Sequence, residues 1–557
     1  MKASFFRTLS WLHTWAGLLV CWVLMLMFFA GTLSYFRHEI TLWTKPELHQ
    51  GAIQSYQTEA LSKQLDLGQN YLETNANTQA QRWIINLPTD RSPLLSYAWQ
   101  LAPEKGQRRG KIIERTALAD GTGVIENVRQ TRGGDFFYRL HYELNYLPGI
   151  TARYIVGICT MFMLIALISG IVIHKRIFKD LFSFRLGKGA RSWLDGHTVS
   201  SVIALPFHLM ITYTGLVTLM LVYIPWTVDT AYPNERQTFL TELNPARQIG
   251  EASGVAANLI PLSHYLAQVE AHWGNAPVQQ VVVAFPKDQN SHVIFYQDTG
   301  NTVTDAQTML IFSGTTGELK YASQDETSSA AVVHDTIMSL HTARFSAPLL
   351  RALYFVCGLL GCAMVASGPL MWAVRLRQQQ QNAIANGEKP TRGLRLVEGL
   401  NFMFIVGLPL GAAAFFYTNR LLTVGFTERA AWEVHSFFIV LIVMGIWAVI
   451  GRSRWHWRLA LSITGLLYCA LPLLNAFTSN CHIFDNIRTE QWGLVGFDIV
   501  SVIFGTMLLF VSNRIKPNHQ PHNALLGNSS SKRVAHYNGA ISKAQNASPT
   551  ALKEVKS

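Results

Sequence analysis

Long apolar runs alternate with polar stretches along the whole chain. A helix needs roughly 20 apolar residues to cross about 30 Å of hydrocarbon. Runs of that length recur often enough to predict a polytopic α-helical membrane protein with about eight transmembrane helices. The first run has too long an apolar core for a signal peptide and lacks a clean small-x-small cleavage site. The expected spans are residues 11–36, 150–174, 198–224, 347–374, 396–418, 431–450, 456–476 and 493–513.

Two long segments between the spans, residues 37–149 and 225–346, have a different pattern. Each begins with a helical stretch and continues with short runs in which β-branched and aromatic residues alternate with polar ones, a pattern typical of strands. Glycine-rich turns follow. Each segment is therefore predicted to form a small α+β module. The expected helices are 58–72 and 261–273, and the expected strands are 82–87, 94–100, 112–119, 278–285, 292–297 and 309–313.

Charge is scarce and unevenly distributed. Of the 557 residues, 14% are charged and 49% are hydrophobic, which excludes an ordinary cytosolic enzyme. Lysine and arginine gather in 175–197, 375–395, 451–458 and the tail, so the positive-inside rule predicts that both termini are cytoplasmic and that both long segments lie outside. The net charge of +12 then reflects membrane topology, which removes nucleic acid as a partner and leaves membrane lipid.

An internal repeat organises the first two thirds of the chain. Residues 1–176 and 190–376 each read as a span, an α+β module and a returning span, in the same orientation. Such parallel repeats imply a pseudo-two-fold axis along the membrane normal. Corresponding positions are His13 and His197, Gly31 and Gly215, His141 and His341, Arg153 and Arg351, and Gly170 and Gly368.

The repeated histidines are the main candidates for chemistry. A single interfacial histidine is usually structural, but a two-fold axis can bring His13 opposite His197 and His141 opposite His341. Two opposed imidazoles are the axial ligation that a b-type haem requires. One pair near each membrane face predicts two haem b groups and an electron path across the bilayer. No CxxCH is present, which excludes covalent c-type haem, and five of the six cysteines lie in apolar spans.

Four other residues could assist these pairs. His208 lies eleven residues after His197, so three helical turns place it on the same face, about 16 Å deeper. His174 closes the second span, and either histidine could replace one of the four or hold a further haem. Arg153 and Arg351 could pair with haem propionates, or they could anchor lipid headgroups.

The last four spans carry a few ionisable residues. Glu433 and His435 share one span, Asp498 lies in another, and Arg395 and Glu398 open a third. They could form a proton or quinol site, and a structural polar cluster is the alternative. No nucleotide-binding motif is present, so electrons would come from membrane quinol or from a separate reductase.

Several segments resemble the PepSY-associated transmembrane family of iron-regulated inner-membrane proteins. They are SGIVIHKRIFKDLFSFR (169–185), WLDGHTVSSVIALPFHLMITYTGL (193–216), LHTARFSAPLLRALYF (340–355), GLRLVEGLN (393–401), RAAWEVHSFF (429–438) and LPLLNAF (471–477). The resemblance implies that the outer modules are PepSY-like and that the protein is a haem-containing reductase of ferric siderophores at the periplasmic face. It would assign haem ligation to His13, His141, His197 and His341.

The predicted organisation has seven parts. An oxidoreductase that reduces ferric siderophore and releases Fe(II) is the main expectation. A peptide-binding or protease-regulating membrane protein and a transporter of iron or siderophore are the alternatives. The parts are the first span (1–36), module one (37–149), two spans with a basic loop (150–224), module two (225–346), the fourth span (347–374), a four-helix extension (396–513) and a disordered cytoplasmic tail (514–557).

Overall fold

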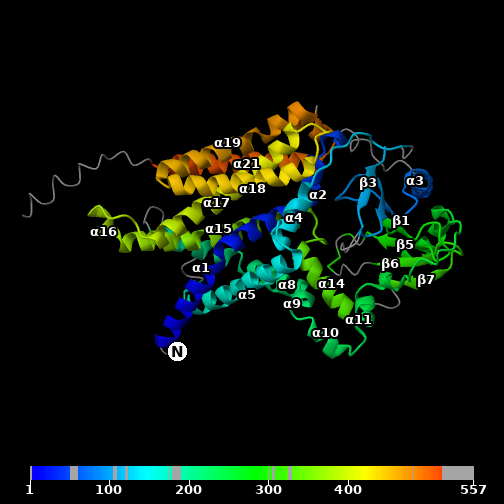
Figure 1. The fold of residues 1–557 in the computed structure, drawn as a ribbon, viewed down its shortest axis with the longest axis horizontal. Helices are drawn as coiled ribbons and strands as arrows, with labels where there is room; N and C mark the ends of the chain where they lie inside the picture. Colours follow the sequence, from blue (N-terminus) through cyan, green and yellow to red (C-terminus); the bar gives the residue numbers. More distant parts are fainter. Residues whose placement is uncertain are drawn as a thin grey trace, which may run out of the picture.

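A computed structural model shows a bundle of long helices with a β-sheet at one end (Figure 1). We call this end the sheet side and the opposite end, where α1 begins, the N-terminal side. The expected tail, most of the first basic loop and the turn at 120–122 lie outside the described residues. These are 3–49, 60–104, 110–118, 123–174, 176–177, 190–298, 300, 302–303, 308–323, 329–479 and 481–516.

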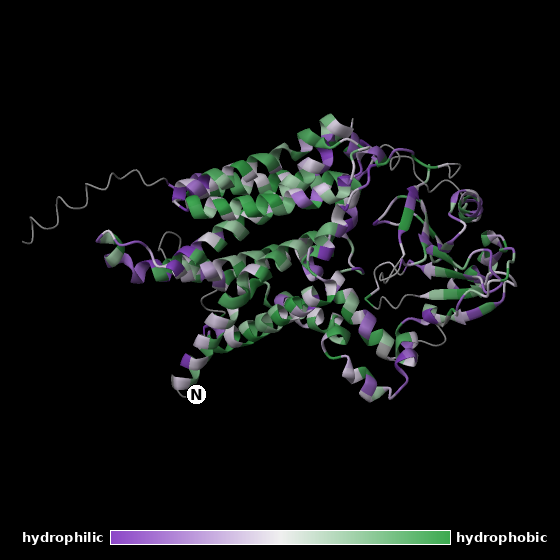
Figure 2. Ribbon diagram, viewed as in Figure 1, coloured by the Kyte–Doolittle hydropathy of each residue, from purple (hydrophilic) through white to green (hydrophobic). Residues whose placement is uncertain are grey.

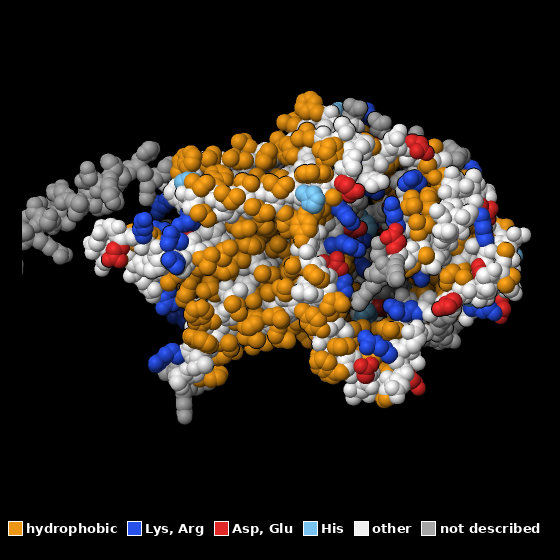
Figure 3. Space-filling view, viewed as in Figure 1, with side chains coloured by type: hydrophobic (Ala, Val, Ile, Leu, Met, Phe, Trp, Pro, Cys, Tyr) orange, Lys and Arg blue, Asp and Glu red, His pale blue; other side chains and the backbone are white. Residues whose placement is uncertain are grey.

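Seven helices of the described chain are long and apolar enough to cross a membrane, and a bent helix pair makes up to eight spans. Their apolar character is evident along the bundle (Figure 2). Much of this apolar surface faces outward (Figure 3), as expected of side chains in contact with lipid. The protein is thus a polytopic helical membrane protein. The seven are α1 (Ala3–Ser34), α5 (Gly149–Ile173), α15 (Pro348–Gln379), α17 (Arg392–Leu421), α18 (Arg429–Ile450), α19 (Arg454–Ser479) and α21 (Trp492–Arg514).

The expected span 198–224 is broken. It consists of α7 (Ala190–Ile203), α8 (Leu205–Thr218) and the short α9 (Met220–Tyr223), with a bend of 69° between the first two. Pro206 lies at the start of α8, and proline lacks the N–H that would continue a helix through this point. The prediction that His197 and His208 share one continuous helical face is therefore wrong.

The strands of both long segments form one antiparallel sheet. Its order is β3-β2-β1-β4-β5-β6-β7, and β1 pairs with β4 at the junction of the two strand sets. Ile84 lies opposite Val282, and each is the fifth residue of its strand. The six expected strands are present, and β7 is additional. The strands are β1 (Ala80–Asn86), β2 (Ser96–Leu101), β3 (Ile112–Thr116), β4 (Val278–Ala284), β5 (His292–Gln297), β6 (Met309–Ser313) and β7 (Leu319–Ala322).

One face of this sheet is covered by the expected helices. These are α3 (Leu61–Asn75), η5 (Leu262–Tyr265) and α12 (Leu266–Trp273). Side chains alternate along β5: Phe295 points to the helices, whereas Ile294 belongs to a smaller cluster on the other face. The two-residue period of a strand explains this division. Three short helices also lie on the sheet side of the molecule. They are α10 (Trp226–Ala231), α11 (Arg236–Leu243) and η4 (Pro245–Gln248).

Two amphipathic helices between the sheet and the spans were not expected. They are α4 (Gly133–Glu143) and α14 (Ser329–Thr342), and they carry His141 and His341. Both histidines therefore lie on helices separate from the following spans. The chain breaks after each helix at a residue with positive φ, Leu144 and Ala343 respectively.

The C-terminal extension forms a packed group of four long helices. α17 contacts α18 and α19, and α19 contacts α21. Both α15 and α1 also contact α17, so the extension leans on the first half of the chain. The remaining elements are α2 (Arg37–Trp43), η1 (Pro46–Leu48), α16 (Gln381–Ala385) and α20 (Ile483–Arg488).

Candidate functional site: two histidine pairs

The first pair lies toward the N-terminal side. The rings of His13 on α1 and His197 on α7 have centroids 6.3 Å apart. Nδ1 of His13 lies 2.9 Å from the carbonyl oxygen of Ala166 on α5. Nδ1 of His197 lies 3.0 Å from the carbonyl oxygen of Met364 on α15. Each ring is thus held by the span that returns within its own half of the predicted repeat.

The second pair lies toward the sheet side. The rings of His141 and His341 have centroids 6.1 Å apart. Nδ1 of His141 lies 2.7 Å from the carbonyl oxygen of Met27 on α1. Nδ1 of His341 lies 3.0 Å from the hydroxyl of Thr214 on α8. The structure therefore brings together both histidine pairs that the sequence predicts.

These contacts define the chemical state of the imidazoles. A carbonyl oxygen only accepts, so Nδ1 of His13, His141 and His197 must carry the proton. In a neutral ring the other nitrogen, Nε2, is then the one with a free lone pair. Hydrogen bonding of one ring nitrogen while the other faces a metal is the usual arrangement of a metal-binding histidine.

A glycine lies beside every one of the four histidines. A Cβ atom would approach the imidazole to 2.8 Å at Gly31, 3.1 Å at Gly170 and 3.0 Å at Gly215. At Gly368 it would remain 4.0 Å away. These are the four glycines that recur in the sequence. The first three let the imidazole approach the helix backbone more closely than any larger residue would allow.

The separation of the rings can be compared with the requirement of a bound metal. Two metal–nitrogen bonds of about 2.0 Å, with about 1.1 Å from each nitrogen to its ring centre, place two trans imidazoles about 6.2 Å apart. The observed centroid separations of 6.3 and 6.1 Å agree with that value. The spacing of both pairs is therefore that of two imidazoles that would share one metal ion, such as a haem iron.

The two pairs lie at different depths of the bundle. Along α1, His13 contributes to one pair, while Met27 and Gly31 contact the other. At 1.5 Å per residue, this places the two levels roughly 21 to 27 Å apart along the helix. This spacing is close to the thickness of a hydrocarbon layer of about 30 Å, as expected of two sites near its opposite faces.

The sheet-side histidines are held neutral by their surroundings. Burial, followed by the neighbouring His141, lowers the pKa of His341 to about 3. Burial also lowers the pKa of His141. Neutral imidazole is the form that binds a metal, so both side chains are in the ligating form near neutral pH.

The other two candidate histidines are not in these pairs. His208 is fully buried, and neither ring nitrogen has a hydrogen-bond partner among the described residues. Its ring packs against Phe28 and Phe207, and Nε2 faces Gly361. His174 lies at the C-terminal end of α5.

The two candidate arginines have carboxylate partners within the chain. Arg153 lies 2.7 Å from Glu143, and Arg351 lies 3.1 Å from Glu39. Nε and Nη1 of the buried Arg351 have no hydrogen-bond partner among the described residues. The neighbouring His38 reports a positive environment around Arg351. The pKa of His38 is lowered to about 3, first by burial and then by the charges of Arg37, Arg91, Arg351 and Arg344. An anionic group near Arg351 would therefore find unpaired donors and a positive field.

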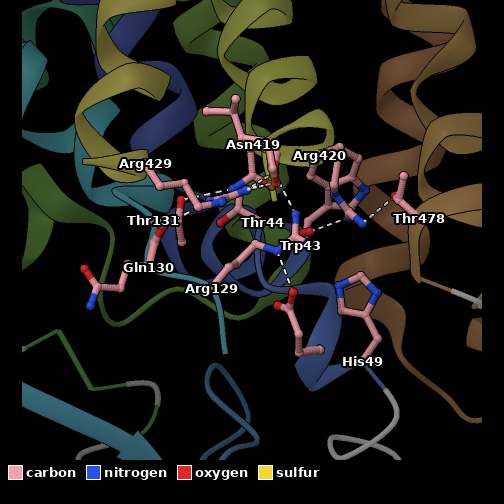
Figure 4. Close-up of polar contacts among 12 residues, drawn as sticks. Trp43, Thr44, His49, Arg129, Gln130, Thr131, Asn419, Arg420, Arg429 and Thr478 are labelled. Carbon is pink, nitrogen blue, oxygen red and sulfur yellow. Dashed lines mark hydrogen bonds and ion pairs between the residues drawn. The ribbon is translucent and has the colours of Figure 1, made fainter. Parts of the chain in front are cut away.

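A separate polar network joins the first half of the chain to the extension (Figure 4). Arg429 lies 2.6 Å from Glu433, whose other oxygen accepts from Thr131 at 2.7 Å. The carboxylate of Asp498 accepts from Trp43 and Asn475. Glu433 and Asp498 therefore belong to a structural cluster, the alternative considered above. Its other members include Glu47, Arg129, Asn419 and Arg420.

Sequence reasoning missed the partners that orient the histidines. Ser169 and Ser367 lie 3.3 and 3.0 Å from Nδ1 of His13 and His197. Both belong to the recurring Ser-Gly dipeptides, so the repeat contained a usable signal. Thr214 precedes the recurring Gly215 in the same way. By contrast, backbone acceptors such as Met27 and Met364 leave no mark on the sequence.

Fold and site together define a polytopic membrane protein with two histidine pairs. The PepSY-associated TM region family matches residues 10–375, and the chain belongs to this family. The match ends near the end of α15, so the four-helix extension lies beyond it. The chain is also similar to an uncharacterized protein of Pseudomonas aeruginosa, with 23% identity over 398 residues that cover 67% of this chain and 93% of the relative.

Proposed function

We propose that the protein carries electrons across the bacterial inner membrane and reduces ferric siderophore on the sheet side, releasing Fe(II). The observation that carries this proposal is the construction of the histidine pairs. Four imidazoles lie beside four glycines, and each ring uses Nδ1 for a hydrogen bond to a neighbouring helix. A histidine with only a structural role requires neither an adjacent glycine nor a hydrogen bond at Nδ1 that recurs at all four positions.

The pairs would hold two haem b groups, one between His13 and His197 and one between His141 and His341. Haem b would supply a one-electron couple at each level. The hydrogen bonds at Nδ1 orient each imidazole and keep Nε2 as the ligand. The unpaired donors of Arg351 would bind a propionate, and Glu143 would orient Arg153 toward the same level.

The internal repeat supports this arrangement. Two facing pairs follow if residues 1–176 and 190–376 are copies related by a two-fold axis. The β1–β4 junction favours such an axis, because Ile84 and Val282 occupy the same position in their strands. The two strand sets would then be PepSY-like modules fused edge to edge. Up to eight spans, with basic loops at the far end, favour a periplasmic sheet and two cytoplasmic termini.

A reduced-minus-oxidised absorption spectrum of the protein in detergent tests this function. We expect b-type bands with a stoichiometry of two haems. His13→Ala and His341→Ala should each remove one haem, whereas His272→Ala, on the exposed surface of the sheet unit, should remove none. Haem-free protein from cells supplied with haem would refute the proposal. Reduction of a ferric siderophore by the loaded protein tests the substrate.

The bent pair α7/α8 favours transport as a second candidate, because broken spans are typical of transporters. Uptake of radiolabelled iron or siderophore into proteoliposomes discriminates between the two. Under the main proposal, electrons cross the membrane and the siderophore remains outside.

A further inference from the structure

One polar pair, formed by His435 of α18 and Tyr146 after α4, lies outside both the histidine pairs and the buried network. Exposed side chains of α18 recur every three or four residues: Trp432, Ile439, Ile442 and Ile446. His435 falls on this same stripe. The stripe is part of the apolar outer surface of the bundle, which faces lipid (Figure 3). A polar side chain at such a place is costly and indicates a function.

His435 has an elaborate set of neighbours. Its Nδ1 makes a short hydrogen bond with the hydroxyl of Tyr146, and the two rings are stacked with an interplanar angle of 11°. Trp432 packs edge-on against the imidazole at 5.6 Å, and Phe438 packs against Tyr146 at 4.9 Å. These four side chains form an aromatic group that we call the α18 cluster.

The chain path delivers Tyr146 to this cluster. α4 ends at Glu143, and both Leu144 and Asn145 have positive φ. That backbone conformation is unfavourable for a residue as bulky as leucine. The turn carries Tyr146 away from its own helix and onto α18. Tyr146 is only five residues from His141, so their Cα atoms are at most about 18 Å apart.

The cluster also leaves polar atoms available for a ligand. Tyr146 is 62% exposed and Trp432 is 46% exposed. Nε2 of His435 has no hydrogen bond among the described residues. This differs from Glu433, two residues earlier, whose carboxylate is buried and saturated with donors. The cluster therefore presents a hydrogen-bonding imidazole and flat aromatic faces toward lipid.

We propose that the α18 cluster binds the head group of a lipid-soluble hydroquinone and is a second point of electron entry, beside the sheet-side pair, for electrons that do not pass through the His13/His197 pair. This inference rests on the proposed function. A hydroquinone is a flat aromatic ring with a hydroxyl at each end, and it reaches this surface only through the bilayer. Trp432 and Tyr146 match the ring, and Nε2 of His435 matches one hydroxyl.

The reaction balances with the ferric substrate as acceptor. One hydroquinone loses two electrons and two protons and becomes a quinone. Nε2 of His435 accepts one hydroxyl proton while Nδ1–H passes its own to Tyr146, whose hydroxyl releases a proton to water on the sheet side. Once the imidazole has regained its first tautomer, the second hydroxyl proton follows the same path. The electrons leave one at a time through the sheet-side pair, and two Fe(III) become two Fe(II).

Photolabelling tests the site without requiring haem. Membranes that contain the full-length protein are illuminated with an azido-ubiquinone, and labelled peptides are mapped by mass spectrometry. We expect labels around Tyr146 and residues 429–440, with protection by decylubiquinol. His435→Leu and Tyr146→Phe should weaken protection about tenfold, as expected for the loss of one hydrogen bond. His456→Gln, at the other end of the same helix group, should leave it unchanged.

A kinetic measurement separates this inference from the proposed function. In haem-loaded protein, both variants should slow reduction by decylubiquinol at least tenfold but leave reduction by dithionite unchanged. The quinol site would be overturned, even in a protein that holds haem, if the photolabel attached to other peptides. It would also be overturned if His435→Leu and Tyr146→Phe left the protection by decylubiquinol unchanged. Labelling at α18 in a protein without haem would instead refute the reductase and retain the site.

Discussion

The molecule buries polar groups in two different ways. The network between the two halves contains three arginines and three carboxylates: Arg129, Arg420, Arg429, Glu47, Glu433 and Asp498. Its carboxylates at Glu433 and Asp498 accept hydrogen bonds at both oxygens. The histidine pairs contain no charge at all. There, one nitrogen of each ring is bound and the other is kept for a ligand.

This difference separates polar groups that hold the fold from those that form a site. A buried charge must be compensated within the chain, so saturated and balanced networks are structural. Imidazole can be buried neutral, which permits an unused nitrogen at modest cost. The network is the more deeply buried region: Arg429, Glu433 and Asp498 are at most 2% exposed, whereas the four paired histidines are half-buried. The network also differs from the histidine pairs in that its charges are paired within the chain, and both oxygens of Glu433 and Asp498 accept hydrogen bonds.

The largest expected effect breaks the network. Arg429→Leu leaves the carboxylate of Glu433 without its ion-pair partner, and the loss of one member of a buried pair costs about 3–5 kcal/mol. The free energy of unfolding in detergent, from a denaturant titration, measures this loss. The double variant Arg429→Leu/Glu433→Leu should recover much of it. Arg377→Ala, in the exposed pair with Glu398, should cost only about 0–1 kcal/mol.

The same denaturant titration, carried out on haem-free protein, tests how much a paired histidine contributes to stability. His141→Leu removes a neutral ring and one hydrogen bond, so it should cost about 1–2 kcal/mol. A loss as large as that of Arg429→Leu would mean that the histidine pair is as structural as the network.

A second prediction sharpens the contrast within the pairs. In Gly31→Ala, the new Cβ would lie 2.8 Å from Nδ1 of His141, so the imidazole must move. We expect loss of the sheet-side haem and a destabilisation of about 1–3 kcal/mol. Gly368→Ala is the matched control, since its Cβ lies 4.0 Å from His197. It should retain both haems and stabilise its helix by up to about 1 kcal/mol.

Haem content per protein, from the absorption spectrum, distinguishes the two glycines. Equal loss in both variants would show that the glycines serve helix packing. Equal retention would show that the imidazoles have room to shift, and the close approach at Gly31 would lose its significance.

The sequence predicted the regular parts of this molecule well. Apolar runs mark the spans because lipid imposes length and composition, and a two-residue period marks the strands. The four histidines and four glycines were predicted to recur, and they lie together. These features depend on local pattern or on comparison of the chain with itself, both of which a single sequence contains.

What the sequence did not predict depends on contacts between distant segments. The union of both strand sets at β1–β4 requires pairing of strands nearly 200 residues apart. The α18 cluster joins Tyr146 to His435, which are separated by 289 residues. The bend before His208 was also missed, although Pro206 was visible, because proline is tolerated in membrane helices when neighbours satisfy the backbone.

The last prediction concerns His49, a buried histidine of the network region, whose substitution changes the pH dependence of stability and not stability at neutral pH. Its Nε2 donates to the carbonyl of Leu42 at 3.0 Å, so the nitrogen that the four paired histidines keep for a ligand is already used. Burial, followed by nearby Arg420, lowers its pKa to about 3. The unfolded chain titrates near 6.5. Between these two pH values only the unfolded state binds the proton, so stability is complete above about 6.5 and falls by about 1.4 kcal/mol per pH unit below it.

His49→Gln keeps a donor for Leu42 and removes this titration. The slope of unfolding free energy against pH, from 6.5 to 5.0, should therefore decrease by about one proton, while haem content stays at the wild-type level. An unchanged slope would show that His49 is accessible to protons in the native state, and a loss of haem would place it with the histidine pairs instead of the network.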